Sequence, residues 1–289
     1  MATAIAKSKQ ASSKGQPFNL TSDNYYSDDA SWHYLSKSLY SEFKKCEAET
    51  IARLKNEYKP DTDIKALLVG NYVHSYFESR ESHDSFCNEH AKQIYKYGKQ
   101  EKGIKKDYEL ADKMIATLEE EPLFQKAYMP GEKEKIVTGE IDGVKWKGKI
   151  DSLNLEKRYF CDLKTTADIH KKIWNPEYRQ WQNFVQAYGY FTQITLYKEL
   201  IKQTFGVDCT PFIFAVSKQA TPDKMAIKFT SGDDVAELSY AMTELKEKEH
   251  HMLAVLNGEE KPTMCGKCDY CRSVKHLTDF VSASAIEVE

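Results

Sequence analysis

The pair Asp142-Gly143 constrains the fold of this chain more than any other local feature of its sequence. It separates the segments 133–141 and 144–153, and in the second of these the apolar residues Val144, Trp146 and Ile150 lie at even spacing. An Asp-Gly pair in this position is typical of a two-residue β-hairpin turn, so we predict that the two segments are antiparallel strands. A third alternating segment, 159–165, follows after a short polar stretch, and we expect it to pair with the second strand. The middle of the chain is therefore predicted to be a sheet.

The segments before and after this sheet carry apolar residues at helical spacing. The predicted helices comprise residues 38–58, 64–78, 109–118, 178–205 and 233–256, and further strands are predicted at 211–217 and 224–229. Helices on both sides of a mixed central sheet define an α/β fold, which we expect to be a single domain over residues 21–275. Residues 1–20 are rich in Ser, Lys, Gln and Ala and are predicted to be a disordered tail, and residues 276–289 a flexible one.

Composition and charge exclude several classes of protein. No apolar run approaches the roughly 18 residues needed to span a bilayer, and residues 1–17 lack the hydrophobic segment of a secretory signal. We therefore expect a cytoplasmic protein with no membrane partner. The formal net charge is −3, so contacts with nucleic acid must come from local basic patches. Seven cysteines are an odd number, and three are crowded near the C-terminus, which favours a metal over a disulfide scaffold.

Two acidic residues, Asp151 and Asp162, mark a candidate site in the predicted sheet. A hairpin between their strands places the two carboxylates opposite each other, roughly 5 Å apart, and Lys164 shares their face because side chains alternate along a strand. Carboxylates this close repel each other unless a cation lies between them, and Mg²⁺ prefers oxygen ligands. The other face is predicted to be apolar and comprises Val144, Trp146, Ile150, Tyr159, Cys161 and Leu163. The alternative is an exposed strand face that merely carries charges, and the pattern alone leaves both open.

Two predicted helices add polar residues spaced by four, which places them on one helix face. His74 and Glu78 lie in the helix 64–78, where they could bind a metal or a phosphate; the alternative is a surface pair. Gln182, Gln186 and Tyr190 lie in a later helix, where such a stripe suits contact with a sugar-phosphate backbone. The alternative for this stripe is a solvated helix face.

Three cysteines near the C-terminus, Cys265, Cys268 and Cys271, are spaced so that their thiolates can bind one metal centre. The fourth ligand must be remote, and Cys46 in the first predicted helix is the candidate. Four thiolates suit a [4Fe-4S] cluster, which we expect here, with Zn²⁺ as the alternative, and the spacing does not decide between them. We expect this centre to be structural. The remaining cysteines are predicted to be buried or isolated thiols and comprise Cys87, Cys161 and Cys209.

Several motifs occur in an order that resembles the RecB-type nucleases of the PD-(D/E)XK superfamily. They are, in chain order, Ser41-Glu42-Phe43-Lys44-Lys45-Cys46, Gly70-x-x-x-His74-x-x-x-Glu78, Gly148-Lys149-Ile150-Asp151, Asp162-Leu163-Lys164 and Gln186-x-x-x-Tyr190. The resemblance covers residues 36–272 and is greatest to phage-encoded RecE-like exonucleases that carry a C-terminal cysteine cluster. No single motif is specific for this superfamily, but the occurrence of all of them in this order is. The resemblance implies a restriction-endonuclease-like core, in which helices flank a mixed sheet.

The resemblance also implies a role for each matched residue. The implied catalytic residues are His74, Glu78, Asp151, Asp162 and Lys164. The implied ligands of a Mg²⁺ or Mn²⁺ ion are Asp151, Asp162 and the carbonyl of Leu163. The implied DNA contacts are Gln186 and Tyr190, and the spacing by four adds Gln182. Two positions depart from the family pattern, since Glu47 follows Cys46 where proline is usual, and Asp162 stands where glutamate is frequent.

The resulting prediction is a metal-dependent DNA exonuclease that hydrolyses phosphodiester bonds and resects linear duplex DNA for phage-type recombination. A single-strand annealing protein as partner, a ring-shaped homo-oligomer and the cytoplasm of a bacterial host are implied by the resemblance alone. The alternative is a non-catalytic DNA-binding or scaffold protein on the same fold, with a structural metal cluster. That alternative predicts a damaged Asp-x-Lys motif, and the motif at Asp162 and Lys164 is intact.

Overall fold

The computed structural model of the chain describes residues 18–61 and 64–286. These residues form two compact units. The first comprises residues 18–37 and 64–250, and the second comprises residues 38–61 and 251–286. Each unit is therefore assembled from two separate stretches of the chain.

The division into two units does not test the predicted single domain over residues 21–275. Both units draw residues from within the range 21–275, so they do not correspond to two consecutive domains. Of the predicted N-terminal tail, residues 1–17 lie outside the described residues. Of the predicted C-terminal tail, residues 276–286 are described and are exposed throughout.

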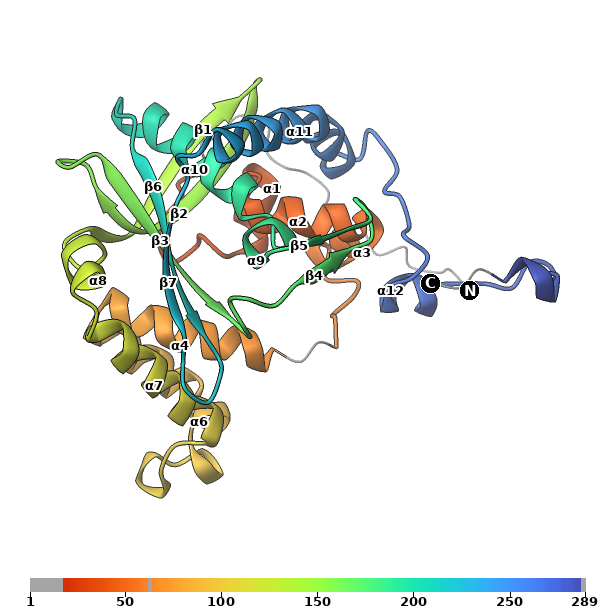
Figure 1. Cartoon of the computed structure of the whole chain (residues 1–289). Helices are drawn as coiled ribbons and strands as arrows, with labels where there is room; N and C mark the ends of the chain where they lie inside the picture. Colours follow the sequence, from red (N-terminus) through yellow and green to blue (C-terminus); the bar gives the residue numbers. More distant parts are fainter. Residues whose placement is uncertain (1–17, 62–63, 287–289) are drawn as a thin grey trace. The chain divides into compact units, whose positions relative to one another are not determined.

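A five-stranded mixed sheet forms the centre of the first unit (Figure 1). Its strands are β1 (Glu132–Ile141), β2 (Val144–Asn154), β3 (Tyr159–Thr166), β6 (Thr210–Ser217) and β7 (Lys224–Lys228), and they lie in the order β1-β2-β3-β6-β7. β3 and β6 run parallel, and the other neighbouring pairs are antiparallel. A separate two-stranded sheet pairs β4 (Ile173–Asn175) with β5 (Gln180–Gln182). The mixed sheet with flanking helices confirms the predicted α/β class.

The turn between β1 and β2 has the predicted form. Asp142 and Gly143 have backbone φ angles of 44° and 85°, and positive values at both positions are what a type I′ turn requires. The pairing of the two strands runs from this turn to their far ends, with one interruption at Glu134 and Asp151. Because a two-residue turn fixes the register, residues equally far from it face each other, and Glu134 and Asp151 are such a pair.

The helices are distributed over both units. In the first unit they are α1 (Asp28–His33), α4 (Lys65–Glu78), α5 (Arg80–Glu89), α6 (Ala91–Ile94), α7 (Lys106–Glu119), α8 (Pro122–Ala127), α9 (Phe184–Ala187) and α10 (Tyr190–Phe205), with the 3-10 turns η1 (Lys96–Gly98) and η2 (Gln100–Lys102). In the second they are α3 (Glu47–Leu54) and α12 (Asp269–Ser273), with the 3-10 turn η3 (Ala283–Ala285). Residues of both units occur in α2 (Lys37–Lys45) and α11 (Gly232–Leu256). Within the described part of the chain, no helix combines the length and the apolar character needed to cross a membrane.

Helices cover both faces of the main sheet. On one side α4, α7 and α8 pack on β3 and β6 (Figure 1), and their shared core includes the fully buried Cys161 and Leu163 of β3. On the other side α10 contacts β1 and β2, and the ring centre of its Tyr197 lies 6.4 Å from that of Phe160 of β3. β3 is therefore buried on both faces, as is typical of a strand in the middle of a covered sheet.

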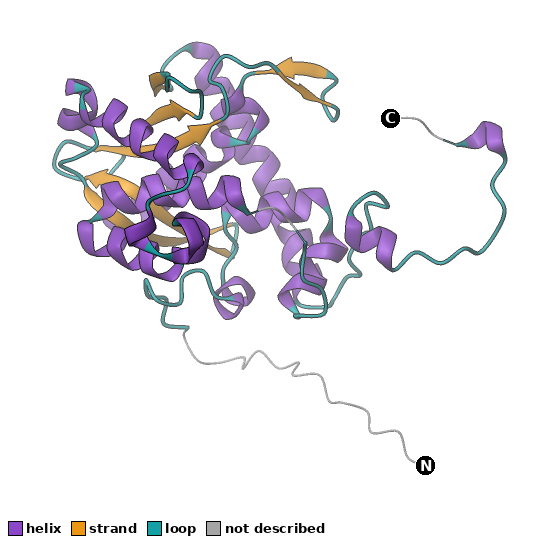
Figure 2. Cartoon of the chain, turned by 90° about the horizontal axis from the view of Figure 1, so that it is seen from below, coloured by secondary structure: helices purple, strands orange, loops and turns teal. Residues whose placement is uncertain are grey.

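The prediction of one helix over residues 178–205 is wrong in its first half. The β4–β5 strand pair occupies the beginning of this region and stands apart from the main sheet (Figure 2). Asn183 then begins α9, because its side chain accepts the backbone N–H of Gln186. Gly189 takes a left-handed conformation with φ of 65°, so α10 begins only at Tyr190. A capping side chain and a glycine thus interrupt a segment whose apolar spacing alone indicates a helix.

The helix predicted over residues 38–58 is two helices, α2 and α3, which are separated at Cys46. The backbone of Cys46 is extended, with φ of −166° and ψ of 109°. Glu47 is the first residue of α3, and its carboxylate accepts the backbone N–H of Thr263 at 2.8 Å and lies 2.9 Å from Nε2 of His251. Contacts within the second unit therefore fix where α3 begins, and no local periodicity records such contacts.

A buried carboxylate makes the stability of the first unit depend on pH. Glu249 of α11 is fully buried, and its Oε2 accepts the indole N–H of the equally buried Trp146 at 2.6 Å. Burial raises the pKa of Glu249 from 4.5 to about 7, although the hydrogen bond from Trp146 opposes this rise. The ionised carboxylate is thus less favourable in the folded protein than in the unfolded chain. The free energy of unfolding therefore falls as the pH rises through the range from 4.5 to about 7.

We expect Glu249→Gln to remove this fall. Glutamine keeps an oxygen that can accept the Trp146 N–H, but it has no charge to bury. Between about pH 5 and about pH 8, the free energy of unfolding of the wild type should fall by about 2 kcal/mol relative to that of the variant, because one pKa unit corresponds to about 1.4 kcal/mol. Urea unfolding of both proteins across this range measures the difference. The same pH dependence in both proteins would contradict the assignment.

Candidate functional site

Three acidic residues lie in a row across neighbouring strands of the first unit. Asp162 is on β3, Asp151 is on β2 and Glu134 is on β1. The β2–β3 pairing ends at Ser152 and Cys161, and its register, continued by one position, sets Asp151 opposite Asp162. Glu134 lies between the pairs Lys133–Ser152 and Lys135–Ile150 of β1 and β2, and one of its carboxylate oxygens is within 4.8 Å of one of Asp151. The structure therefore brings the two predicted acids together and adds a third, and we call these three residues the acidic row.

A helix covers the Asp162 end of the acidic row. Asp162 is 1% exposed, and its Oδ1 accepts the side-chain amide N–H of Gln193 at 2.8 Å. Gln193 is on α10, which packs over this face of the sheet. Asp162 and Lys164 thus lie on the face of β3 opposite Cys161 and Leu163, as predicted, and helices cover the polar face as well as the apolar one. The sequence signal for Gln193 is a polar residue among the apolar, core-facing residues of α10.

Lys164 lies on the same face as Asp162. Its Nζ is 2.7 Å from Oδ2 of Asp162 and 4.7 Å from the ring centre of Tyr190. Burial lowers the pKa of Lys164, but the charges around it, that of Asp162 above all, outweigh burial and raise the pKa above its ordinary value. The side chain is thus a fixed ammonium group, which is suited to binding an anion and unsuited to accepting a proton.

Asp151 connects the strands to α4. Its Oδ2 accepts the backbone N–H of Leu163 at 2.7 Å and lies 3.5 Å from Nδ1 of His74. Burial and the charge of Asp162 raise the pKa of Asp151 to about 7. Burial and the charge of Lys164 lower the pKa of His74, so its imidazole is neutral at neutral pH. Neutral imidazole is the form in which histidine binds a metal.

Glu134 is the acid that the linear motifs do not contain. Its backbone φ is 53°, a left-handed value that is uncommon for a glutamate. Its carboxylate lies 2.6 Å from Nζ of Lys149. Burial and the charge of Asp151 raise the pKa of Glu134, and the ion pair with Lys149 opposes this rise. The signal for Glu134 in the sequence is the turn at Asp142-Gly143, because that turn sets its register against Asp151.

The residues around Asp151 fit a divalent cation. One ligand atom each of His74, Glu134 and Asp151 lies within 4.8 Å of the others, and Asp162 is next in the row. Burial and a neighbouring carboxylate raise the pKa of both acids, Asp162 acting on Asp151 and Asp151 acting on Glu134, so a positive charge among them would be favourable. Carboxylate oxygens are the ligands that Mg²⁺ and Mn²⁺ prefer, whereas an imidazole nitrogen is a ligand more typical of transition-metal ions.

Glu78 lies near the acidic row without being one of its closest members. It is the last residue of α4, and its Oε2 accepts the hydroxyl of Ser82 at 2.6 Å. Its charge acts on Glu134 and on Lys149. Glu78 is therefore near enough to Glu134 for its charge to act on the acidic row, and its catalytic role stays a prediction.

The predicted stripe of Gln182, Gln186 and Tyr190 is not one helical face, because each residue lies in a different element. Gln182 is buried on β5, where its side chain bonds across the hairpin. Gln186 is on α9 and accepts the backbone N–H of Asn183 at 3.3 Å, which completes the cap of this helix. Of the three, Tyr190 contacts the site, through the ammonium of Lys164.

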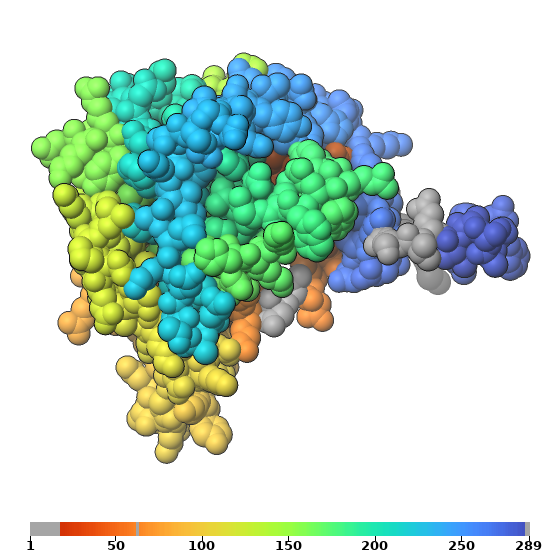
Figure 3. Space-filling view, in the orientation of Figure 1, coloured from red at the N-terminus to blue at the C-terminus, as the bar shows by residue number. Residues whose placement is uncertain are grey.

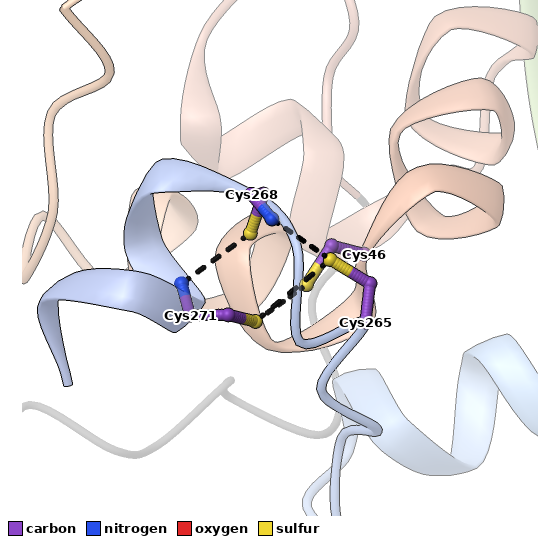
Figure 4. A group of neighbouring side chains, drawn as sticks. All are labelled: Cys46, Cys265, Cys268 and Cys271. Carbon is purple, nitrogen blue, oxygen red and sulfur yellow. Dashed lines mark hydrogen bonds between the residues drawn. The ribbon is translucent and has the colours of Figure 1, made fainter. Parts of the chain in front are cut away.

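The second unit contains the predicted cysteine site (Figure 4). Cys46, between α2 and α3, lies with Cys265, Cys268 and Cys271 so that all four sulfurs are within 4.8 Å of one another. The Sγ–Sγ distance is 3.5 Å from Cys46 to Cys271 and 3.9 Å from Cys265 to Cys271. The structure thus brings the remote Cys46 to the C-terminal triplet, as predicted. The other three cysteines are buried, also as predicted, and comprise Cys87, Cys161 and Cys209.

Backbone N–H groups point at the sulfurs of this site. Those of Lys267 and Cys268 donate to Sγ of Cys265 at 3.4 Å and 3.3 Å, and that of Cys271 donates to Sγ of Cys268 at 3.4 Å. Burial raises the pKa of Cys265, but these donors outweigh it and lower the pKa to about 7. Such donors stabilise the thiolate, which is the form of cysteine that binds a metal.

Comparison with known proteins gives a family and a similar structure. Residues 36–274 match the family described as a PDDEXK-like domain of unknown function. The fold is similar to the crystal structure of a "putative exonuclease" from Eubacterium rectale, with a TM-score of 0.81 and 34% sequence identity, and the similarity covers 92% of this chain and 97% of that chain. None of the curated protein sequences matches the chain.

Proposed function

Because the chain belongs to the family of PDDEXK-like domains, we propose that it is a metal-dependent deoxyribonuclease, specifically an exonuclease that hydrolyses linear duplex DNA. The observation that supports this most directly is the acidic row of Glu134, Asp151 and Asp162, with the ammonium group of Lys164 fixed beside it. Carboxylates that can hold a divalent cation, next to a permanent positive charge, are what phosphodiester hydrolysis requires. The intact motif disfavours the alternative of a non-catalytic DNA-binding or scaffold protein.

In this proposal the acidic row and His74 would hold Mg²⁺ or Mn²⁺, with the carbonyl of Leu163 as a further ligand. A divalent cation in this position supplies polarisation of the scissile phosphate and lowers the pKa of a water molecule. The backbone N–H of Leu163 keeps the carboxylate of Asp151 in place. Burial leaves His74 uncharged and therefore able to offer a nitrogen lone pair.

Lys164 would bind a phosphate oxygen and offset the negative charge that builds there in the transition state. Asp162 and the ring of Tyr190 hold its ammonium group, and Gln193 in turn holds Asp162. These successive contacts keep the ammonium group of Lys164 in one position before the substrate binds. A group that is already in place needs no reorganisation as the reaction proceeds, which is the main source of electrostatic catalysis.

We propose an exonuclease rather than an endonuclease because of the similarity to the protein from Eubacterium rectale. The similar protein from Eubacterium rectale carries the name of an exonuclease, and 97% of its chain is covered. A role in resecting duplex ends for recombination, with an annealing partner and a ring-shaped homo-oligomer, is proposed on the resemblance of the sequence motifs alone.

Incubation of the purified protein with linear and with closed circular duplex DNA tests the proposal. We expect Mg²⁺ to support the release of nucleotides from the linear duplex, EDTA to stop it, and the closed circles to stay intact. If the closed circles are linearised, the protein is an endonuclease and the proposal of an exonuclease is wrong. If neither DNA is degraded with Mg²⁺ or Mn²⁺, the nuclease proposal is wrong.

We also propose that the four thiolates of the cysteine site bind a single Zn²⁺. In tetrahedral zinc sites the Zn–S bonds of about 2.3 Å set the sulfurs about 3.8 Å apart, and the distances of 3.5 Å and 3.9 Å agree with this. A [4Fe-4S] cluster takes each thiolate on a different iron and so holds the sulfurs further apart. Metal analysis distinguishes the two, because zinc without colour is expected here, whereas iron and a brown protein would favour the cluster.

A further inference from the structure

The hairpin of β4 and β5 carries an aromatic surface that the proposed hydrolysis does not use. Trp174 and Trp181 lie directly opposite each other on the two strands, with ring centres 5.4 Å apart. Despite this pairing, 49% of Trp174 and 63% of Trp181 remain exposed. Figure 3 shows the green segment that contains this hairpin at the surface of the molecule. Two adjacent tryptophans this open form an apolar patch of the kind that marks an interaction site.

A depression of about 350 Å³ lies beside the two tryptophans. Its lining includes both of them, Tyr188, and the exposed Lys171 and Lys172. Aromatic rings together with ammonium groups suit a nucleic-acid strand, because the rings stack on bases and the lysines neutralise phosphates. Asp168 also lines the depression, where its Oδ1 accepts the backbone N–H of His170. The two lysines leave the depression with a net positive charge.

The depression begins where the strand that bears Lys164 ends. Thr166 and Ala167, which line it, follow Lys164 within a few residues. The ring centre of Tyr188 lies 6.0 Å from that of Tyr190, whose ring contacts the Lys164 ammonium. Aromatic rings therefore lead from the proposed site of hydrolysis to the depression beside the hairpin.

We propose that this surface, formed by Lys171, Lys172, Trp174, Trp181 and Tyr188, binds single-stranded DNA by stacking on its bases. The inference rests on the proposed nuclease function and specifies the form of the DNA next to the active centre. Within an intact duplex, the face of each base is covered by its neighbours, so a stacking surface selects a strand that has been separated from its partner. The hairpin would thus hold one strand of an opened duplex end.

A purely structural role for the tryptophan pair makes a different prediction. Cross-strand aromatic pairs stabilise hairpins, and Trp174→Phe/Trp181→Phe keeps such a pair while Trp174→Ala/Trp181→Ala removes it. If the rings only stabilise the hairpin, loss of DNA binding in the alanine variant should accompany a lower unfolding temperature. If the rings bind bases, the alanine variant should lose affinity at an unchanged unfolding temperature, and the phenylalanine variant should keep most of it.

Titration of the protein with an oligothymidylate tests the proposal. Binding is monitored by tryptophan fluorescence, without added Mg²⁺ so that no DNA is hydrolysed. We expect the oligonucleotide to quench the tryptophan fluorescence of the wild type. Measured by fluorescence anisotropy of a labelled oligonucleotide, the affinity of the alanine variant should be about 10- to 100-fold lower, because base stacking is lost. The phenylalanine variant should bind within about threefold of the wild type, measured by fluorescence anisotropy of a labelled oligonucleotide. Tyr97→Ala is the matched control, because Tyr97 is 90% exposed elsewhere in the first unit, and it should bind normally.

Equal affinity of the wild type and a folded alanine variant would overturn the proposal. A fall in affinity that is matched by unfolding of the variant, with no quenching of the wild type, would assign the pair a structural role and would also overturn it. Hydrolysis is measured separately, on duplex DNA with Mg²⁺, so a failure of binding here is distinct from a failure of the nuclease function. Binding of the oligonucleotide by a protein that degrades no DNA would leave the stacking surface standing and reject the nuclease alone.

Discussion

Asp162→Asn is expected to lower the rate of Mg²⁺-dependent DNA hydrolysis by at least about 10³-fold. The substitution removes one carboxylate of the acidic row and the counter-ion of Lys164, whose Nζ lies 2.7 Å from Oδ2 of Asp162. Asparagine keeps the oxygen that accepts the N–H of Gln193, so we expect the fold to hold. Release of nucleotides from labelled linear duplex DNA measures the rate, and thermal unfolding of the variant checks the fold.

Asp84→Asn is the matched control for this experiment. Asp84 is an exposed aspartate on α5 that pairs with Arg80 at the surface, and surface ion pairs contribute little. Its rate should therefore equal that of the wild type. A folded Asp162→Asn protein with the activity of the control would remove Asp162 from the catalytic centre and would reject the metal site built on it.

Cys271→Ser is expected to release the metal of the second unit and to unfold this unit. Zinc binding contributes about 10–16 kcal/mol in small zinc-finger peptides, whereas the loss of a buried side chain usually costs a few kcal/mol. The sulfur of Cys271 lies 3.5 Å from that of Cys46 and 3.9 Å from that of Cys265, so its loss opens the site. The measurements are zinc content, which should fall to nearly none, and limited proteolysis, which should cut within the second unit.

Cys209→Ala is the control, since Cys209 is equally buried but belongs to the first unit. It should keep the metal and the resistance of the second unit to protease. A Cys271→Ser protein that loses its metal yet resists protease like the control would show that the cysteine site does not stabilise the fold.

The predictable parts of the fold are those that neighbouring residues determine. The two residues Asp142 and Gly143 set the register of two strands, because their backbone conformation leaves one way to pair them. Asp151 and Asp162 could be placed on a common face because side chains alternate along a strand whatever surrounds it. The position of the cysteine triplet is equally local, whereas its pairing with Cys46 was predicted by the need for a fourth ligand.

The parts of the fold that were not predicted have two causes. Either two local sequence signals conflict, or the structure depends on contacts between residues far apart in the sequence. Over residues 178–205, the apolar spacing indicates one helix, but Asn183 and Gly189 carry the stronger local signals, a cap and a left-handed backbone. The burial of Asp162 depends on α10 folding back over β3, which no spacing within β3 reveals. Its partner Gln193 lies 31 residues further along the chain.

The cysteine site also bears on the order in which the chain can fold as it is made. Cys46 and Cys271 are 225 residues apart, so the first thiol leaves the ribosome long before the last. The main sheet of the first unit has all of its strands once Lys228 has emerged, and domains fold largely in the order of their synthesis. A nascent chain could therefore present the acidic row before its second unit is complete. The four thiolates could then bind their metal only after Cys271 has been synthesised, so this step would come last.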